Sequence, residues 1–205
     1  MDNFVVTIAR GFGSGGRTIG MMLSEKLGIE FYDKDLIKLA SEDSGINEAL
    51  FGEKDEKTTT GIFGKPSVYK GGVITPDKAA FTSEENLFNY QAKVIKQLAE
   101  QKSCVIVGRC ADYILGDRDN VVRVFIYADE ENCVQNAAQV RGIVDRKEAL
   151  RKIAATDKER AAYYKAHTGR EWIDARNYDL CLNSGSLGFD KCVQIISDYI
   201  RIKLG

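Results

Sequence analysis

The chain has 205 residues, of which 44% are hydrophobic and 29% are charged, the composition of a globular protein with one sizeable core. Its formal charge of −1 argues against a nucleic-acid partner, since such proteins carry a basic excess. No apolar run approaches membrane-spanning length, and the chain opens on a strand pattern without a signal peptide. The five scattered cysteines and single histidine fit neither a disulfide framework nor a zinc site, so we expect a cytoplasmic protein without a membrane partner.

The first predicted strand is the apolar run 4–9, which leads directly into a glycine-rich loop. The loop matches the P-loop pattern G-x-x-x-x-G-K-[ST] except that arginine stands at the lysine position. Backbone N–H groups of such a loop form an anion-binding concavity, and the following helix adds its N-terminal donors. We therefore predict a nucleotide-phosphate site that takes ATP and Mg²⁺. The expected binding residues are Gly11, Gly13, Ser14, Gly15, Gly16, Arg17 and Thr18.

Arg17 and Thr18 have the most specific roles in this loop. An arginine stays charged and can donate two parallel hydrogen bonds to phosphate oxygens, which favours phosphate binding. Its planar group follows a transferring phosphoryl group less well than a compact ammonium does, so the sequence supports binding more strongly than catalysis. Thr18 is placed to offer its hydroxyl to Mg²⁺. The alternative is a tight strand-to-helix turn that binds no ligand.

Helical and strand patterns alternate along the next part of the chain. A helix begins near Arg17, carries apolar residues at four-residue spacing and ends at Gly28. A short strand at 31–32 ends at Asp33, which is also a candidate cap for a helix through residue 40. From 45 to 81 the periodicity disappears among glycines, prolines and polar residues. We expect an insert or mobile flap there, because a long stretch without regular structure in a compact domain is usually functional or disordered.

Regular patterns return with a helix-capping signature at 82–85. The apolar runs 104–107 and 121–126 predict strands that are buried on both faces of a parallel sheet. Further helices are expected over 129–140 and from Asp145 towards Gly169, then a strand at 180–182 and a closing helix at 189–204. The whole chain thus predicts a single α/β domain over 1–205, a three-layer P-loop NTPase fold with a five-stranded parallel sheet.

Several stretches together resemble the cytidylate kinase-like members of the P-loop nucleoside monophosphate kinases. Residues 9–17 are similar to the opening of that family, in which arginine at the lysine position is usual. The resemblance continues over 31–37 and 105–115, where a strand leads into the pair Gly108-Arg109, and over 157–161 and 178–184. It covers most of the chain outside about 45–81.

The resemblance implies ATP-dependent phosphoryl transfer to a cytidine-type nucleoside monophosphate, with a lid at about 141–170 and a monophosphate site near 45–81. In the family the arginine of the Gly-Arg pair contacts the monophosphate, and here that pair follows the carboxyl end of a buried strand, where ligands bind in such sheets. The implied catalytic residues are Arg17, Arg109, Arg151 and Arg160, and the implied substrate-binding residues are Asp33, Asp35 and Arg109. Without the resemblance, the mixed charges around Arg151 and Arg160 indicate a solvated helix face.

One position departs from the family. Cytidylate kinases carry an aspartate before the Gly-Arg pair, and Val107 stands there in this chain. Asp33 or Asp35 would then have to supply the carboxylate, although each also fits as a plain helix cap. Two alternatives follow. One is a kinase for a hydroxyl of a small metabolite, with Asp33 or Asp35 as base. The other is a nucleotide-binding module with little or no kinase activity.

Overall fold

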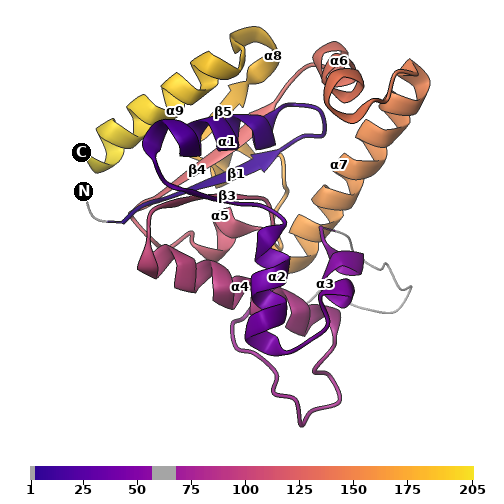
Figure 1. The fold of residues 1–205 in the computed structure, drawn as a ribbon, viewed down its shortest axis with the longest axis vertical. Helices are drawn as coiled ribbons and strands as arrows, with labels where there is room; N and C mark the ends of the chain where they lie inside the picture. The colour runs from indigo at the N-terminus through magenta and orange to yellow at the C-terminus, as the bar shows by residue number, and fades with distance from the viewer. Residues whose placement is uncertain (1–2, 57–67) are drawn as a thin grey trace.

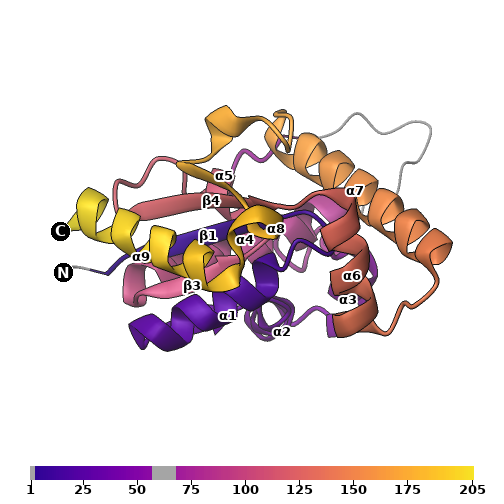
Figure 2. The same cartoon turned by 90° about the horizontal axis from the view of Figure 1, so that it is seen from above.

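The computed structural model describes residues 3–56 and 68–205. Within them, five parallel strands form one sheet in the order β2-β3-β1-β4-β5, with helices on both faces (Figures 1 and 2). This confirms the expected three-layer α/β fold with a five-stranded parallel sheet. The strands are β1 (Val5–Arg10), β2 (Glu30–Tyr32), β3 (Cys104–Val107), β4 (Val121–Tyr127) and β5 (Leu180–Asn183).

The helices lie close to their predicted positions. The bounds of the closing helix agree with the sequence pattern, and the other predicted helices begin or end within a few residues of it. None of the helices in the described ranges is long and apolar enough to cross a membrane. The helices are α1 (Gly16–Leu27), α2 (Asp35–Ser44), α3 (Glu48–Lys54), α4 (Glu84–Gln101), α5 (Ala111–Ile114), α6 (Glu130–Arg141), α7 (Arg146–Thr168), α8 (Ser184–Leu187) and α9 (Phe189–Leu204), with a 3-10 turn η1 (Ala175–Asn177).

Two apolar layers enclose the sheet. Helices α1 and α9 cover one face, while α2, α4 and α5 lie against the other (Figure 1). The central strands β1, β3 and β4 contact both layers, which explains why their sequences are mostly apolar rather than alternating. Most of their side chains are buried; Val6 and Val105 face one layer, and Val5 and Ile106 face the other.

The expectation of no regular structure from 45 to 81 is wrong for part of that stretch. Helix α3 begins after Asn47, whose side chain accepts a hydrogen bond from the backbone N–H of Ala49. It is anchored by Phe51, which is fully buried in the core beneath the sheet. One buried side chain in seven residues produces no detectable periodicity, so the sequence pattern missed this helix. The part of the expected flap at 57–67 lies outside the described residues.

The strand order brings three chain segments together at one edge of the sheet. Because the strands are parallel, their carboxyl ends meet there, and ligands bind at this edge in open α/β sheets. The glycine-rich loop follows β1 in the centre, Gly108 and Arg109 follow the neighbouring β3, and Asp33 follows β2 beyond it. Residues far apart in the sequence therefore form one site.

Candidate functional site

The glycine-rich loop is shaped by packing behind it. Gly13 and Gly15 adopt positive φ angles of 78° and 77°, a region that other residues enter only at a cost. A Cβ on Gly13 would lie 2.5 Å from the carbonyl oxygen of Cys133, and one on Gly15 would lie 2.3 Å from the ring of Phe189. Helices α6 and α9 thus press on the loop from outside, and only glycine fits at these two positions.

Side chains from other elements fix the carbonyl groups of the loop. Asn136 of α6 donates to the carbonyl of Gly13 at 2.7 Å, and Ser184 donates to the carbonyl of Ser14 at 2.6 Å. The hydroxyl of Ser14 itself donates to Gly11 O at 2.9 Å, so this buried serine braces the loop. The first N–H groups of α1 have no partner inside the helix. They form an anion-binding end of the kind that holds phosphates.

This loop forms one wall of a cavity of about 500 Å³, a volume typical of small-molecule sites. Helices α6 and α7 also contribute to the lining, and of these two α7 lies within the predicted lid region at 141–170. Basic and acidic side chains from other segments complete the lining. The loop residues in the lining are Gly11, Phe12, Gly13, Gly15, Gly16, Arg17 and Thr18; the other lining residues are Arg10, Asp33, Lys34, Asp55, Glu56, Asn136, Ala137, Val140, Arg141, Arg160 and Phe189.

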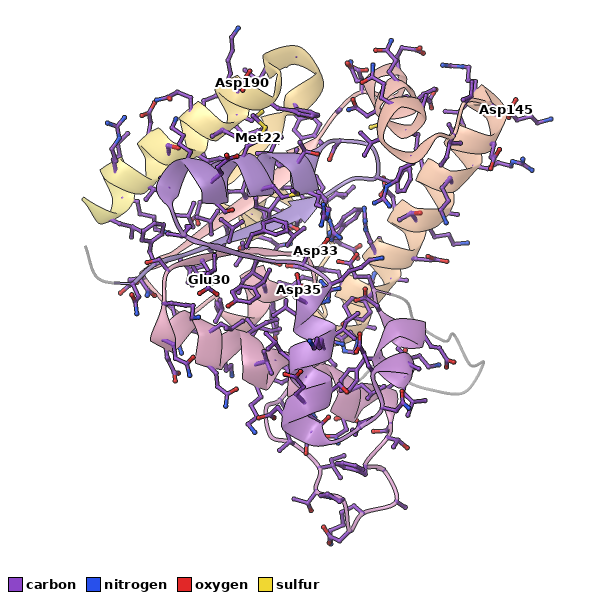
Figure 3. All side chains as sticks on the ribbon, in the orientation of Figure 1. Met22, Glu30, Asp33, Asp35, Asp145 and Asp190 are labelled. Carbon is purple, nitrogen blue, oxygen red and sulfur yellow. The ribbon has the colours of Figure 1, made fainter. Side chains whose placement is uncertain are left out.

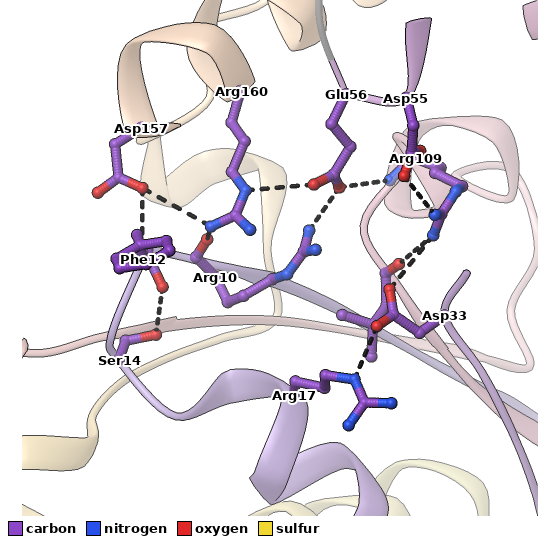
Figure 4. A network of polar contacts seen from close by, with 12 residues as sticks. Arg10, Phe12, Ser14, Arg17, Asp33, Asp55, Glu56, Arg109, Asp157 and Arg160 are labelled. Carbon is purple, nitrogen blue, oxygen red and sulfur yellow. Dashed lines mark hydrogen bonds and ion pairs between the residues drawn. The ribbon is translucent and has the colours of Figure 1, made fainter. Parts of the chain in front are cut away.

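Asp33 joins two of the predicted arginines. Its Oδ2 accepts from Nε of Arg17 at 2.8 Å, and its Oδ1 accepts from Nη1 of Arg109 at 3.4 Å (Figure 4). It is buried and does not cap α2, which has no side-chain cap. Asp35, labelled with Asp33 in Figure 3, is exposed in the first turn of α2 and does not line the cavity. Only the first of these two aspartates lies in the site.

Arg109 lies deeper than the sequence suggests. Gly108, Arg109 and Cys110 all have positive φ angles, 77°, 53° and 55°, and this turn places the Arg109 side chain in the interior with 1% exposed. Its Nη2 donates to Oδ2 of Asp55 at 2.9 Å and its Nη1 to the carbonyl of Val107 at 3.3 Å. The guanidinium is therefore held by protein carboxylates.

A second group of charges surrounds Glu56. Nη1 of Arg10 and Nε of Arg160 lie 2.5 and 3.2 Å from its two oxygens (Figure 4). Burial alone would raise the pKa of Glu56, but the two guanidiniums outweigh burial and hold this pKa well below its usual range. Burial together with the charge of Arg10 lowers the pKa of Arg160. Both arginines and the carboxylate are thus present as ions.

Arg160 also links α7 to the loop. Its Nη1 donates to the carbonyl of Arg10 at 3.0 Å, and the neighbouring Asp157 accepts from the backbone N–H of Phe12 at 2.7 Å. Burial raises the pKa of Asp157. One turn of α7 therefore holds the start of the loop in place. Arg151, two turns earlier on α7, is exposed and lies outside the cavity lining.

The structure brings Arg17, Thr18, Asp33, Arg109 and Arg160 to one place and leaves Arg151, Asp35 and the Ser14 side chain outside the cavity. Sequence reasoning missed Arg10, Asp55 and Glu56. The position of Arg10 at the end of β1, directly before the loop, was a usable signal. Asp55 and Glu56 follow a helix without a detectable pattern, and nothing in the sequence marked them.

Two side chains beside the loop could contribute to holding a metal ion. Val107 is fully buried among apolar side chains, so no carboxylate stands at that place. Within residues 3–56 and 68–205, no three His, Cys, Asp or Glu side chains gather into a metal centre. Thr18 and Asp33 line the cavity beside the loop, and a hydroxyl and a carboxylate suit Mg²⁺ when phosphates complete its coordination.

Solved structures share this fold. An uncharacterized protein from Eubacterium ventriosum ATCC 27560 is 26% identical, with 97% of this chain and 99% of that chain covered and a TM-score of 0.72. A shikimate kinase from Acinetobacter baumannii in complex with shikimate is 15% identical (100% and 97% covered, TM-score 0.52). A gluconokinase from Sinorhizobium meliloti 1021 is 11% identical (98% and 98% covered, TM-score 0.50). The two kinases support the P-loop kinase fold alone.

No protein of curated function matches the chain. The family model described as the cytidylate kinase-like family matches residues 5–186. This range includes the glycine-rich loop, Asp33, the Gly108-Arg109 turn and the α7 arginine, all of which meet at the carboxyl edge of the sheet. The chain belongs to the cytidylate kinase-like family.

Proposed function

We propose that this chain transfers the γ-phosphoryl group of ATP to a nucleoside monophosphate of the cytidine type. The observation that carries the proposal is the cavity between the loop and the arginines. Backbone donors and Arg17 line one wall, and Arg10 and Arg160 line the wall that faces them. Cations on two sides of one cavity suit a reaction in which both reactants carry phosphate.

The loop side has the donor set that ATP needs. The N–H groups at the start of α1 and the positive helix end would bind the phosphates, and Arg17 would contact them from the rim of the cavity. ATP and Mg²⁺ supply the phosphoryl group and neutralise part of its charge. Arg160 is placed to neutralise more, because it extends from α7 to the start of the loop.

The acceptor side is the arginine-rich wall at the ends of β1 and β3. A monophosphate is already ionised near neutral pH, so its transfer needs orientation and charge neutralisation more than a base. Asp33 positions Arg17 and Arg109 relative to each other through its two oxygens. In this role it orients the cations, and the acceptor phosphate is held by the arginines.

A hydroxyl kinase is the second candidate, and the carboxylate of Asp33 in the cavity lining favours it. A hydroxyl acceptor gains from a carboxylate base, and the solved structures of this fold include a shikimate kinase in complex with shikimate and a gluconokinase. Against this role, both oxygens of Asp33 already accept hydrogen bonds from arginine. The concentration of guanidiniums around it fits a phosphate acceptor better than a neutral hydroxyl.

An ADP-release assay over a panel of acceptors tests the proposal. The panel holds the nucleoside monophosphates together with shikimate and gluconate. We expect the highest kcat/KM with CMP, and its loss in Arg109→Ala and Arg160→Ala, while Arg151→Ala serves as the exposed control on the same helix. Turnover of a sugar or cyclic alcohol that Asp33→Asn abolishes and Arg109→Ala spares would instead establish the hydroxyl kinase. ATP binding by calorimetry without turnover of any acceptor would identify a nucleotide-binding module.

A further inference from the structure

Glu56 lies where a phosphate group would find a complete set of donors. Its Oε1 accepts from Nη1 of Arg10 at 2.5 Å and from the backbone N–H of Arg109 at 3.3 Å, and its Oε2 accepts from Nε of Arg160 at 3.2 Å (Figure 4). Two guanidiniums and a backbone N–H around one oxyanion form a typical phosphate-binding arrangement. The carboxylate is thus bound as a phosphate would be.

Asp55 extends the same contact to a third arginine. Its Oδ2 accepts from Nη2 of Arg109, but its Oδ1 and the Nε of Arg109 are both buried without a hydrogen-bond partner among the described residues. Unpaired buried groups destabilise a structure. Glu56 adds a backbone cost, since its φ of 52° lies in the left-handed region. The acidic pair is therefore an imperfect occupant of this site.

The charges of the pair match those of a phosphomonoester. Two consecutive carboxylates supply about −2 between them, and a phosphomonoester carries about −1.5 to −2 at neutral pH. Replacing one by the other leaves the charge balance around Arg10, Arg109 and Arg160 nearly unchanged. A neutral ligand in the same place would take the carboxylate partner from Arg10 and leave Arg109 and Arg160 with the single carboxylates of Asp33 and Asp157.

Glu56 also lies between two cavities. Glu56 lines the large cavity beside the loop, and it lines a small cavity of about 20 Å³ together with Gly108, Arg109 and Trp172. A Cβ on Gly108 would lie 2.0 Å from Oε1 of Glu56, so the missing side chain makes room for an oxyanion at this point. If Glu56 moves out, Arg109 becomes accessible from the large cavity.

We propose that Asp55 and Glu56 are an internal occupant of a phosphate subsite formed by Arg10, Arg109 and Arg160, and that the phosphate of the acceptor displaces them. The assignment to the acceptor rests on the proposed function. The phosphate subsite is inferred only from the contacts of Asp55 and Glu56 with the three arginines. Binding is then a competition between an external phosphomonoester and a pair of carboxylates of the same chain. Removing the internal competitor raises the apparent affinity for phosphate.

Inorganic phosphate is the first probe, titrated by calorimetry and by the fluorescence of Trp172, the single tryptophan of the chain. We expect Glu56→Gln to bind phosphate at least about tenfold more tightly than the unmodified protein. In the unmodified protein the Glu56 carboxylate fills the site in most molecules, and this lowers the apparent affinity for added phosphate. Glu53→Gln is the matched control, since Glu53 is exposed on α3. Equal affinities in the two variants would overturn the proposal.

Two further measurements keep the test decisive. If Glu56→Gln does not fold, Asp55→Asn removes one competing charge and is expected to tighten phosphate binding about threefold, in line with partial release of the site; unchanged binding would refute the proposal.

CMP and a nonhydrolysable ATP analogue then separate the two phosphate sources. We expect the gain with CMP alone, and a gain only with the ATP analogue would overturn the assignment to the acceptor. All titrations proceed without turnover, so absence of kinase activity would contradict the proposed function and leave this result intact.

Discussion

The replacement Asp33→Asn tests how the site holds its arginines. The change keeps the shape of the side chain and removes the charge that Arg17 and Arg109 share. The pair with Arg17 involves a half-exposed side chain, so its loss costs only about 0–1 kcal/mol. The bond to the buried Arg109 is charge-assisted and long, and its loss costs about 1.5–2 kcal/mol, the lower part of the range for such bonds.

We therefore expect Asp33→Asn to lower the free energy of unfolding by about 2 kcal/mol. For a chain of this size this corresponds to a decrease in Tm of about 4–8 °C. Asp35→Asn is the matched control: it removes the same charge two residues later, at an exposed helix N-terminus, where about 0.3–1 kcal/mol is at stake.

Urea unfolding followed by Trp172 fluorescence and thermal unfolding by circular dichroism measure both variants. Calorimetry with ATP on the same samples reports whether Arg17 still reaches the phosphates once Asp33 releases it. A loss of stability in Asp33→Asn no larger than that in Asp35→Asn would refute the reasoning. The ion pairs drawn around Asp33 would then contribute nothing to the fold, and its proposed role in orienting the arginines would fail with them.

Three other changes have definite expected outcomes. Arg17→Lys should keep the affinity for ATP in calorimetry within about tenfold, since phosphate binding needs a cation but not two parallel hydrogen bonds from it. A complete loss of ATP binding would contradict the assignment of the glycine-rich loop as a phosphate site. Gly15→Ala should destabilise the protein more than Gly28→Ala in urea unfolding, because both have positive φ but only the first Cβ meets a neighbour, the ring of Phe189; equal losses would show that the ring yields. Burial raises the pKa of Asp112 to about 6, so the folded state binds a proton that the unfolded state releases, and the contribution of Asp112 to stability falls as pH rises from about 4 to about 6. Asp112→Asn should remove this contribution and make the free energy of unfolding change more positively with pH across this range, and a slope equal to that of the unmodified protein would contradict the assignment.

The fold was predictable because its signals are local and strong. Runs such as 104–107 are apolar on both faces, and caps such as Asp145 and Gly169 mark the ends of α7. The loop at 11–18 combines strand, glycines and helix in one short stretch. These features need no knowledge of distant residues, and each was placed to within a few residues.

The inner charges of the site were not predictable in the same way. Glu56 and Asp55 follow a short helix whose single anchor, Phe51, leaves no periodic pattern. Their partners lie 46 and 54 residues away in the sequence, and a carboxylate gives no sign of which guanidinium it will contact. The burial of the Arg109 side chain was also not predictable from the sequence. It depends on three successive residues with left-handed backbone conformation, of which only Gly108 is a glycine.

The geometry around Asp33 gives a physical reason for arginine at position 17. A lysine carries its three donors on one nitrogen, so it would contact Asp33 and a phosphate together only if both lay beside that single atom. Arg17 donates from Nε to Asp33 and from Nη1 to the sulfur of Met21, while its side chain lines the cavity. The guanidinium therefore links the glycine-rich loop to the Asp33–Arg109 pair through one of its nitrogens and has others for further contacts. Under the proposed function, an aspartate placed between two arginines in this way would couple the wall that binds ATP to the wall that binds the acceptor, and the arginine at position 17 would be part of that connection.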